Sequence, residues 1–337
     1  MKNVTKIVIL FLCATLTLSS CTRKQLTPDI PDEKVPIGFS AQSQNAMVKS
    51  ETETGIPLSV DFGVWGIARH PDIDQTYMLW YDDGFMHAQK NQSTGYYESD
   101  EAAYWVGGYT YNFIAYAPFN DGEDSGLSEF QYIPKSEASE DALKFVYDMS
   151  KKAYDYDLLG AVAETSVTVG TTPESQRLIF LHLLSKINIR ILFDGAKDAA
   201  GMPTDVVNVS DMSLKNVNTK ATYTLSGRNS LNVKCEAEDE TTAINFNGSS
   251  GVVNILPQNV SDVVLELDFT VGEGVNAIST TNYQVDIGAV HEFVGKSTDY
   301  KYNEQYNWII TINPKNMSFD VSVTEWKTGG SFDFDIQ

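Results

Sequence analysis

The sequence predicts an all-β protein, and three observations lead to that prediction. Apolar and polar residues alternate with a period of two over segments such as 108–117 and 263–271, which is the pattern of a half-buried strand. Turn-forming pairs such as Asp194-Gly195 and Ser226-Gly227 separate segments of this kind. Helical patterns are sparse, and residues 136–149 and 198–200 are the only modest candidates. We therefore expect β-sandwiches built from hairpins and Greek-key connections.

The expected strands recur along the chain. In residues 58–68, Val60, Phe62 and Val64 share one face, and in residues 108–117 Tyr111 and Phe113 do the same. Further strands are expected at residues 186–193, 213–225, 263–271, 308–313 and 317–326.

The 337-residue chain is long enough for two domains that each bury a core. A polar run at residues 164–174 contains Gly170 and Pro173 and precedes an apolar strand, as domain linkers often do. We place the boundary near residue 172, which gives an N-terminal sandwich at 35–172 and a C-terminal sandwich at 173–337.

The first residues have the features of a removable export signal. Lys2 and Lys6 make the start positive, and residues 7–18 are apolar but too few for a permanent membrane span. Leu18-Ser19-Ser20-Cys21 follows and resembles the bacterial lipobox, in which the cysteine thiol receives diacylglycerol before cleavage. Residues 1–20 are therefore predicted to be a lipoprotein signal peptide. An ordinary secretory signal with an incidental cysteine is the alternative.

Cys21 is predicted to be the lipidated first residue of the mature chain. Several acyl chains hold a protein at a membrane more firmly than one, because each buried methylene adds about 0.8 kcal/mol. Residues 21–34 carry two prolines and many charges and are expected to form a solvated tether. With Cys13 removed and Cys21 lipidated, Cys235 is left without a disulfide partner.

The charge of the chain excludes one class of partner. Asp and Glu number 45 against 24 Lys and Arg, which gives a net charge of −21, and no basic cluster offsets it. A charge of this sign repels phosphate backbones, so no nucleic-acid partner is expected.

The sequence lacks the usual marks of catalysis. It has no HExxH, no G-x-S-x-G and no phosphate-binding glycine loop, so we expect no enzyme, no cofactor and no metal site. The four histidines lie in separate segments. His182 is expected in the core, because it shares a strand face with Phe180, whereas His70, His87 and His291 flank turns and are expected at the surface.

Several segments together are similar to the fimbrillin-like lipoproteins of Bacteroidales, which are subunits and accessory proteins of type V pili. The similarity is carried, in chain order, by VPIGFSAQ (35–42), DFGVWGIARH (61–70), YWVGGYTYNFIAYAP (104–118), FLHLLSKINIRI (180–191), LKNVNTKATYTL (214–225) and FDVSVTEW (319–326). Each segment alone is a weak signal, but they extend over most of the chain.

The resemblance implies two transthyretin-like sandwiches in a pilus subunit or a tip or accessory adhesin. It implies export as a lipoprotein to the outer membrane, exposure in a fimbrium at the cell surface, other pilus subunits as partners in a homo- or hetero-polymer, and a host protein or glycan as receptor. Assembly would proceed by donor-strand exchange, in which a strand of one subunit completes a sheet of the next.

Two parts of the sequence suit such an exchange at the N-terminal end. Ile37 and Phe39 alternate with smaller residues in a short first strand, which would be displaced. In the family a trypsin-like protease cuts after a basic residue in the following loop, and Lys49 is the candidate here. The alternative is that Lys49 is an ordinary solvated residue. The hypothesis requires that the first strand lie in a sheet, and that it not be held centrally between two other strands so that it could never leave.

The C-terminal tail offers a candidate donor strand. Phe332, Phe334 and Ile336 alternate with acidic residues. The tail is alternatively an edge strand of its own domain, guarded by its acidic residues against aggregation. In that case the protein would be a tip or accessory subunit.

A second function remains open, that of a surface glycan-binding β-sandwich lipoprotein. Tyr77, Trp80 and Tyr81 lie in an aromatic stretch that could stack on a sugar ring. Packing of these rings on the sheet is the favoured interpretation.

Overall fold

The computed structural model describes residues 34–43, 56–72, 76–80, 85–99, 101–119, 125–135, 137–153, 156–171, 173–193, 207–246, 248–272, 277–312 and 317–325. Strands dominate these residues, and the sheets pack on one another, which confirms the all-β prediction. The regular helices among them are short, one 3-10 turn η2 (Met149–Lys151) and one helix α2 (Ile287–Phe293). No helix in this part of the chain is long and apolar enough to cross a membrane.

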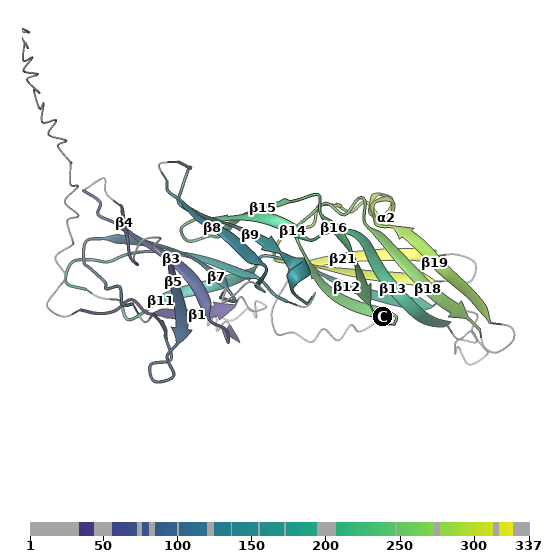
Figure 1. Cartoon of the computed structure of the whole chain (residues 1–337), viewed down its shortest axis with the longest axis horizontal. Coiled ribbons are helices and arrows are strands. Elements are labelled where there is room, and N and C mark those ends of the chain that lie inside the picture. The colour runs from purple at the N-terminus through teal and green to yellow at the C-terminus, as the bar shows by residue number, and fades with distance from the viewer. Residues whose placement is uncertain are drawn as a thin grey trace, which may run out of the picture.

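Nine strands at one end of the molecule form a sheet that closes on itself (Figure 1). The order around the ring is β11-β10-β7-β3-β5-β6-β1, and β1 pairs again with β11; β2 lies beside β1 and β4 beside β3. The strands are β1 (Phe39–Ser43), β2 (Ile56–Pro57), β3 (Phe62–Arg69), β4 (Thr76–Met78), β5 (Phe85–Lys90), β6 (Tyr97–Glu98), β7 (Thr110–Ala117), β10 (Leu159–Ser166) and β11 (Gln176–His182).

The central strands of this ring are buried on both faces. Phe62 and Phe113 point into the core that the ring encloses, whereas Trp65 and Tyr116 belong to the larger core of the rest of the molecule. Alternate residues of a strand point to opposite faces, so the near-continuous apolar runs of β3 and β7 are explained by two cores, one on each side.

A four-stranded sheet connects the ring to the other end of the molecule. Its order is β15-β14-β9-β8, and Figure 1 shows these strands between the ring and the remaining sheets. Phe130 of β8 stacks on Trp65 of the ring with ring centroids 5.6 Å apart, and Phe145 of β9 lies 5.5 Å from Tyr223 of β14. The strands are β8 (Leu127–Ile133), β9 (Ala142–Asp148), β14 (Lys220–Ser226) and β15 (Asn232–Ala237).

Two further four-stranded sheets share one core at the far end of the molecule. Ile189 and Trp308 contribute to this core from one sheet, and Leu214 and Leu267 contribute from the other. The first sheet has the order β17-β12-β20-β21, made of β17 (Ser250–Ile255), β12 (Ser185–Phe193), β20 (Glu304–Ile312) and β21 (Met317–Glu325). The second has the order β16-β13-β18-β19, made of β16 (Thr241–Phe246), β13 (Val207–Asn218), β18 (Val264–Val271) and β19 (Ile278–Asp286).

The sheets do not divide at residue 172. Strand β11 follows this position but pairs with β1 and β10, and β14 follows it but pairs with β9 over seven residues. The division of the chain into two domains remains a prediction, and strands β8 and β9 share a sheet with the later strands β14 and β15.

Two local predictions were wrong. Residues 142–148, within the expected helix at 136–149, form strand β9, because they pair with β8 and β14 and bury Leu143, Phe145 and Tyr147 in the core. The other candidate helix, 198–200, lies outside the described residues. His291, expected at the surface, is fully buried on α2, whereas His182 is buried in the core as expected.

Candidate strand-exchange site

Strand β1 has the alternation that the sequence predicted. Phe39, Ala41 and Ser43 are buried, and Ser40 and Gln42 between them are partly exposed. Phe39 is 0% exposed. Ile37 is also buried but lies just before the strand, and its backbone N–H donates to the carbonyl of Ala103 over 2.8 Å. The candidate displaced residues are therefore both built into the ring's core.

The backbone of β1 is paired on both sides, but unequally. On one side it runs parallel to β11 over all five residues, from Phe39 opposite Gln176 to Ser43 opposite Phe180. On the other side its antiparallel partners are short, with one residue pair to β6 and two to β2. β1 closes the ring, and removing it would leave a slot with unpaired backbone groups on β11.

Phe39 anchors the strand in an aromatic cluster. Its ring centroid lies 5.2 Å from that of Phe113, 6.0 Å from Phe62 and 6.4 Å from Trp80, with the first two contacts edge-to-face. Rings prefer this geometry because the positive edge of one meets the negative face of another. Withdrawal of β1 would uncover the apolar faces of these rings, which a replacement strand would have to cover.

Two tyrosines beside the slot are held neutral. Burial, and second the charge of Asp61, raises the pKa of Tyr97, whose hydroxyl donates to the carbonyl of Leu58. Burial raises the pKa of Tyr111 to about 12, and its hydroxyl bonds to the backbone of Val106. These bonds fix the loops around β1 without introducing a charge.

Tyr77 and Trp80, the described members of the candidate sugar-binding aromatics, do not form an exposed binding surface. Trp80 is 4% exposed and packs against Phe39 and Phe113, so its indole is not available to stack on a sugar. Tyr77 is half-buried against Tyr109, at 5.9 Å between ring centroids. In the structure, Trp80 thus packs in the core of the ring.

A glycine explains why Trp80 can lie in the core. A Cβ on Gly66, in the middle of β3, would come within 2.3 Å of Cζ3 of Trp80. The missing side chain makes room for the indole. A glycine inside an otherwise apolar strand was the sequence signal that could have revealed this burial.

Several predicted site residues lie outside the described part of the chain: Cys21, Lys49, Tyr81, Phe332, Phe334 and Ile336. Lys49 falls between β1, which ends at Ser43, and β2, which begins at Ile56. In the described residues, no group of three or more His, Cys, Asp or Glu side chains is placed to hold a metal ion.

Comparisons with known proteins give a consistent result. A solved fimbrial protein from Bacteroides vulgatus is 14% identical, with a TM-score of 0.55, and the match covers 86% of this chain and 99% of that one. A candidate cell adhesion protein from Bacteroides ovatus is 13% identical, with a TM-score of 0.51 and coverage of 88% and 100%. These likenesses show a shared fold. No curated protein matches the chain.

The family comparison goes further than the fold. The family model described as fimbrillin-like matches residues 53–326, which is most of the chain. The chain belongs to the fimbrillin-like family.

Proposed function

We propose that the protein is a non-enzymatic subunit or tip or accessory adhesin of a type V pilus, joined to its neighbours by donor-strand exchange. Membership of the fimbrillin-like family supports a fimbrial or adhesive role at the cell surface. The observation that carries the proposal is that β1, a five-residue segment close to the predicted mature start, closes the ring and fills its core through Phe39.

The proposed trigger is cleavage after Lys49. The cut would remove the covalent link between β1 and β2, and the segment up to the cut would then be held by hydrogen bonds and burial alone. Because β1 has neighbours on both sides, its release must break the ladder to β11 and the shorter pairings to β6 and β2. We therefore expect release to be slow unless an incoming strand replaces these bonds as they break.

The proposed donor is a strand with the same alternation as β1. The tail residues Phe332, Phe334 and Ile336 have it, but their side chains are larger than Ala41 and Ser43 at the second and third positions. The slot would have to widen to accept this tail from another copy. If the tail belongs to its own domain, the protein accepts a strand and donates none, which is the position of a tip or accessory subunit.

The proposed location is the outer membrane, with Cys21 carrying the lipid and residues 22–34 acting as the tether. Metabolic labelling with a clickable palmitate analogue tests this part independently, since Cys21→Ser should abolish labelling of the chain. Labelling that persists in this variant would contradict lipidation at Cys21.

Assembly is tested by limited trypsin treatment of the mature protein. We expect cleavage after Lys49, followed by ladders that resist SDS and by filaments in negative-stain electron micrographs. Lys49→Gln should block both, whereas Lys296→Gln, at an exposed turn distant in sequence, should assemble normally. A protein that is cut after Lys49 and stays monomeric, alone and with other subunits present, would contradict the proposal.

A further inference from the structure

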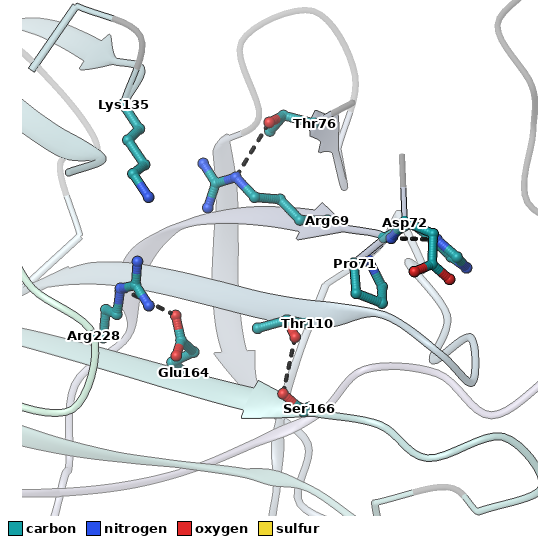
Figure 2. A pocket seen from close by; sticks show the side chains of 10 residues that line it. Arg69, Pro71, Asp72, Thr76, Thr110, Lys135, Glu164, Ser166 and Arg228 are labelled. Carbon is teal, nitrogen blue, oxygen red and sulfur yellow. Dashed lines mark hydrogen bonds and ion pairs between the residues drawn. The ribbon is translucent and has the colours of Figure 1, made fainter. Parts of the chain in front are cut away.

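A cavity of 590 Å³ lies where the ring meets the connecting sheet (Figure 2). Strand β3 ends there with Arg69, β7 begins there with Thr110, and β10 ends there with Ser166. The turns after β8 and β14 add Lys135 and Arg228. Five segments that are far apart in sequence thus contribute to one space, which we call the cationic pocket.

Arg69 is held in place by a partly buried network. Its Nε donates to the hydroxyl of Thr76 over 3.2 Å, and its Nη2 forms an ion pair with Asp141, whose side chain is only 2% exposed. The same carboxylate accepts from the hydroxyl of Tyr132 and from the backbone N–H of Lys135, the latter over 3.0 Å. Such a network fixes the guanidinium before any ligand arrives, which reduces the entropy lost on binding.

Of the other two cations, only Lys135 leaves an uncompensated charge in the pocket. Arg228 pairs with Glu164 at 3.5 Å and remains half-exposed. The ammonium group of Lys135 makes no ion pair with any described residue, although the protein as a whole has a net charge of −21. Figure 2 shows the ends of Arg69, Lys135 and Arg228 directed toward the same space. Asp141 and Glu164 already compensate the charges of Arg69 and Arg228, so the charge that remains for an anionic ligand is that of Lys135.

The remaining lining selects among anions. Thr110 and Ser166 present hydroxyls that bond to each other over 2.9 Å, and Asp72 and Glu164 add carboxylates that accept hydrogen bonds. A polyanion would be repelled by these carboxylates. A ligand with one negative charge and several hydroxyl groups would satisfy both the cations and the acceptors, and a cavity of this volume admits one or two sugar rings.

We propose that the cationic pocket binds the carboxylate of an acidic sugar, a uronate or a sialate, with Lys135 and Arg69 at the carboxylate and the hydroxyls and carboxylates of the lining at the sugar hydroxyls. This inference goes beyond the pilus role, because it assigns a ligand site that strand exchange does not use. Tyr77 and Trp80, the described members of the aromatic stretch, are not part of its lining.

Titration calorimetry of the uncleaved mature protein tests the proposal with galacturonate oligomers and sialyllactose, against galactose oligomers and lactose as neutral counterparts. We expect an acidic sugar to bind and its neutral counterpart to bind at least about tenfold more weakly, since one charge-assisted contact is lost. Lys135→Gln should weaken binding by about tenfold or more, and added salt should weaken it further. Lys296→Gln, which changes an exposed lysine outside the pocket, should leave the affinity unchanged.

Three results would overturn the assignment. The first is equal binding of the acidic and neutral sugars, and the second is no binding of any acidic sugar at millimolar concentration. The third is tighter binding of an acidic peptide than of the sugars, which would make the ligand a protein. A melting temperature of Lys135→Gln equal to that of the unaltered protein shows that the loss of binding does not result from unfolding.

Discussion

Phe39 is the largest buried side chain of β1. Its side chain contacts three other rings and has no exposed surface. The backbone pairing of β1 with β6 and β2 is short. The side chain of Phe39 therefore contributes more to holding β1 in the ring than it would in a strand paired along its full length on both sides.

We expect Phe39→Ala to lower the free energy of unfolding by about 3–5 kcal/mol, because it leaves a cavity in a packed aromatic core. Urea denaturation followed by tryptophan fluorescence measures this. Phe293→Ala is the matched control, since Phe293 is 90% exposed, and it should change stability by no more than about 0.5 kcal/mol. Equal losses in the two variants would show that Phe39 is not an anchor.

His291 makes stability depend on pH. Its Nδ1 lies 2.8 Å from the carbonyl of Ile287, so this nitrogen carries the proton, and its Nε2 faces the hydroxyl of Tyr300 at 3.0 Å. Tyr300 in turn accepts from Nε1 of Trp308 over 2.6 Å. Burial lowers the pKa of His291 below its usual 6.5 and outweighs the opposing effect of the Ile287 carbonyl.

Since the folded pKa of His291 is the lower one, the unfolded chain takes up this proton first as pH falls. The contribution of neutral His291 to the free energy of unfolding is therefore fully present above about pH 6.5. It is lost as the pH falls from there through the folded pKa, by at most about 1.4 kcal/mol per pH unit. His291→Gln should remove this part of the pH dependence. Melting temperatures of both proteins between pH 7.5 and 5 test it, and parallel curves would contradict it.

At the scale of elements, the slot between β11 and the short strands β6 and β2 is the feature that strand exchange would use. The parallel ladder from β1 protects the backbone of β11, and the N–H of Gln176 donates to the carbonyl of Gly38 over 2.8 Å. Departure of β1 would leave such donors without partners until another strand arrives.

We expect amide hydrogen exchange over residues 176–180 to accelerate on the order of tenfold or more when trypsin cleavage is followed by release of β1. Strand β18, in a distant sheet, should keep its protection. Trypsin-treated Lys49→Gln serves as the control and should show no change. Unaltered exchange at 176–180 after complete cleavage would mean that β1 remains in the ring.

At the scale of the whole molecule, two cores meet at the ring. The side chains of Trp65 and Tyr116 face away from the enclosed core and stack on Phe130. Phe145 contacts Phe130 in turn and stacks on Tyr223. Arg69 and Asp141 add an ion pair across the same junction. The two ends of the molecule are thus joined by shared side chains as well as by the chain itself.

This junction leads us to expect that a fragment ending at residue 172 does not fold. It would lack β11, which closes the ring, and β14, which covers β9, so Phe145 and Tyr147 would be exposed. Size-exclusion chromatography and circular dichroism of residues 34–172 test this, with the intact mature chain as the control. A monomeric fragment with native strand content would support a domain boundary at 172.

The sequence by itself determined the all-β class, the positions of the main strands along the chain and the resemblance to the fimbrillin-like family. Period-two alternation is a local property, and it located β3, β7, β12, β18 and β20 to within a few residues. The alternation of Phe39 with Ser40 likewise revealed the short first strand.

Only the tertiary structure decided which strands pair and which polar groups meet. Residues 142–148 became a strand because distant residues 220–226 pair with them, and His291 was buried by segments that local patterns do not specify. The cationic pocket could not be predicted from the sequence for the same reason, since Arg69, Lys135 and Arg228 are brought together only by the packing of separate sheets. Local sequence fixes the alternation of a strand, whereas its neighbours depend on contacts across the whole chain.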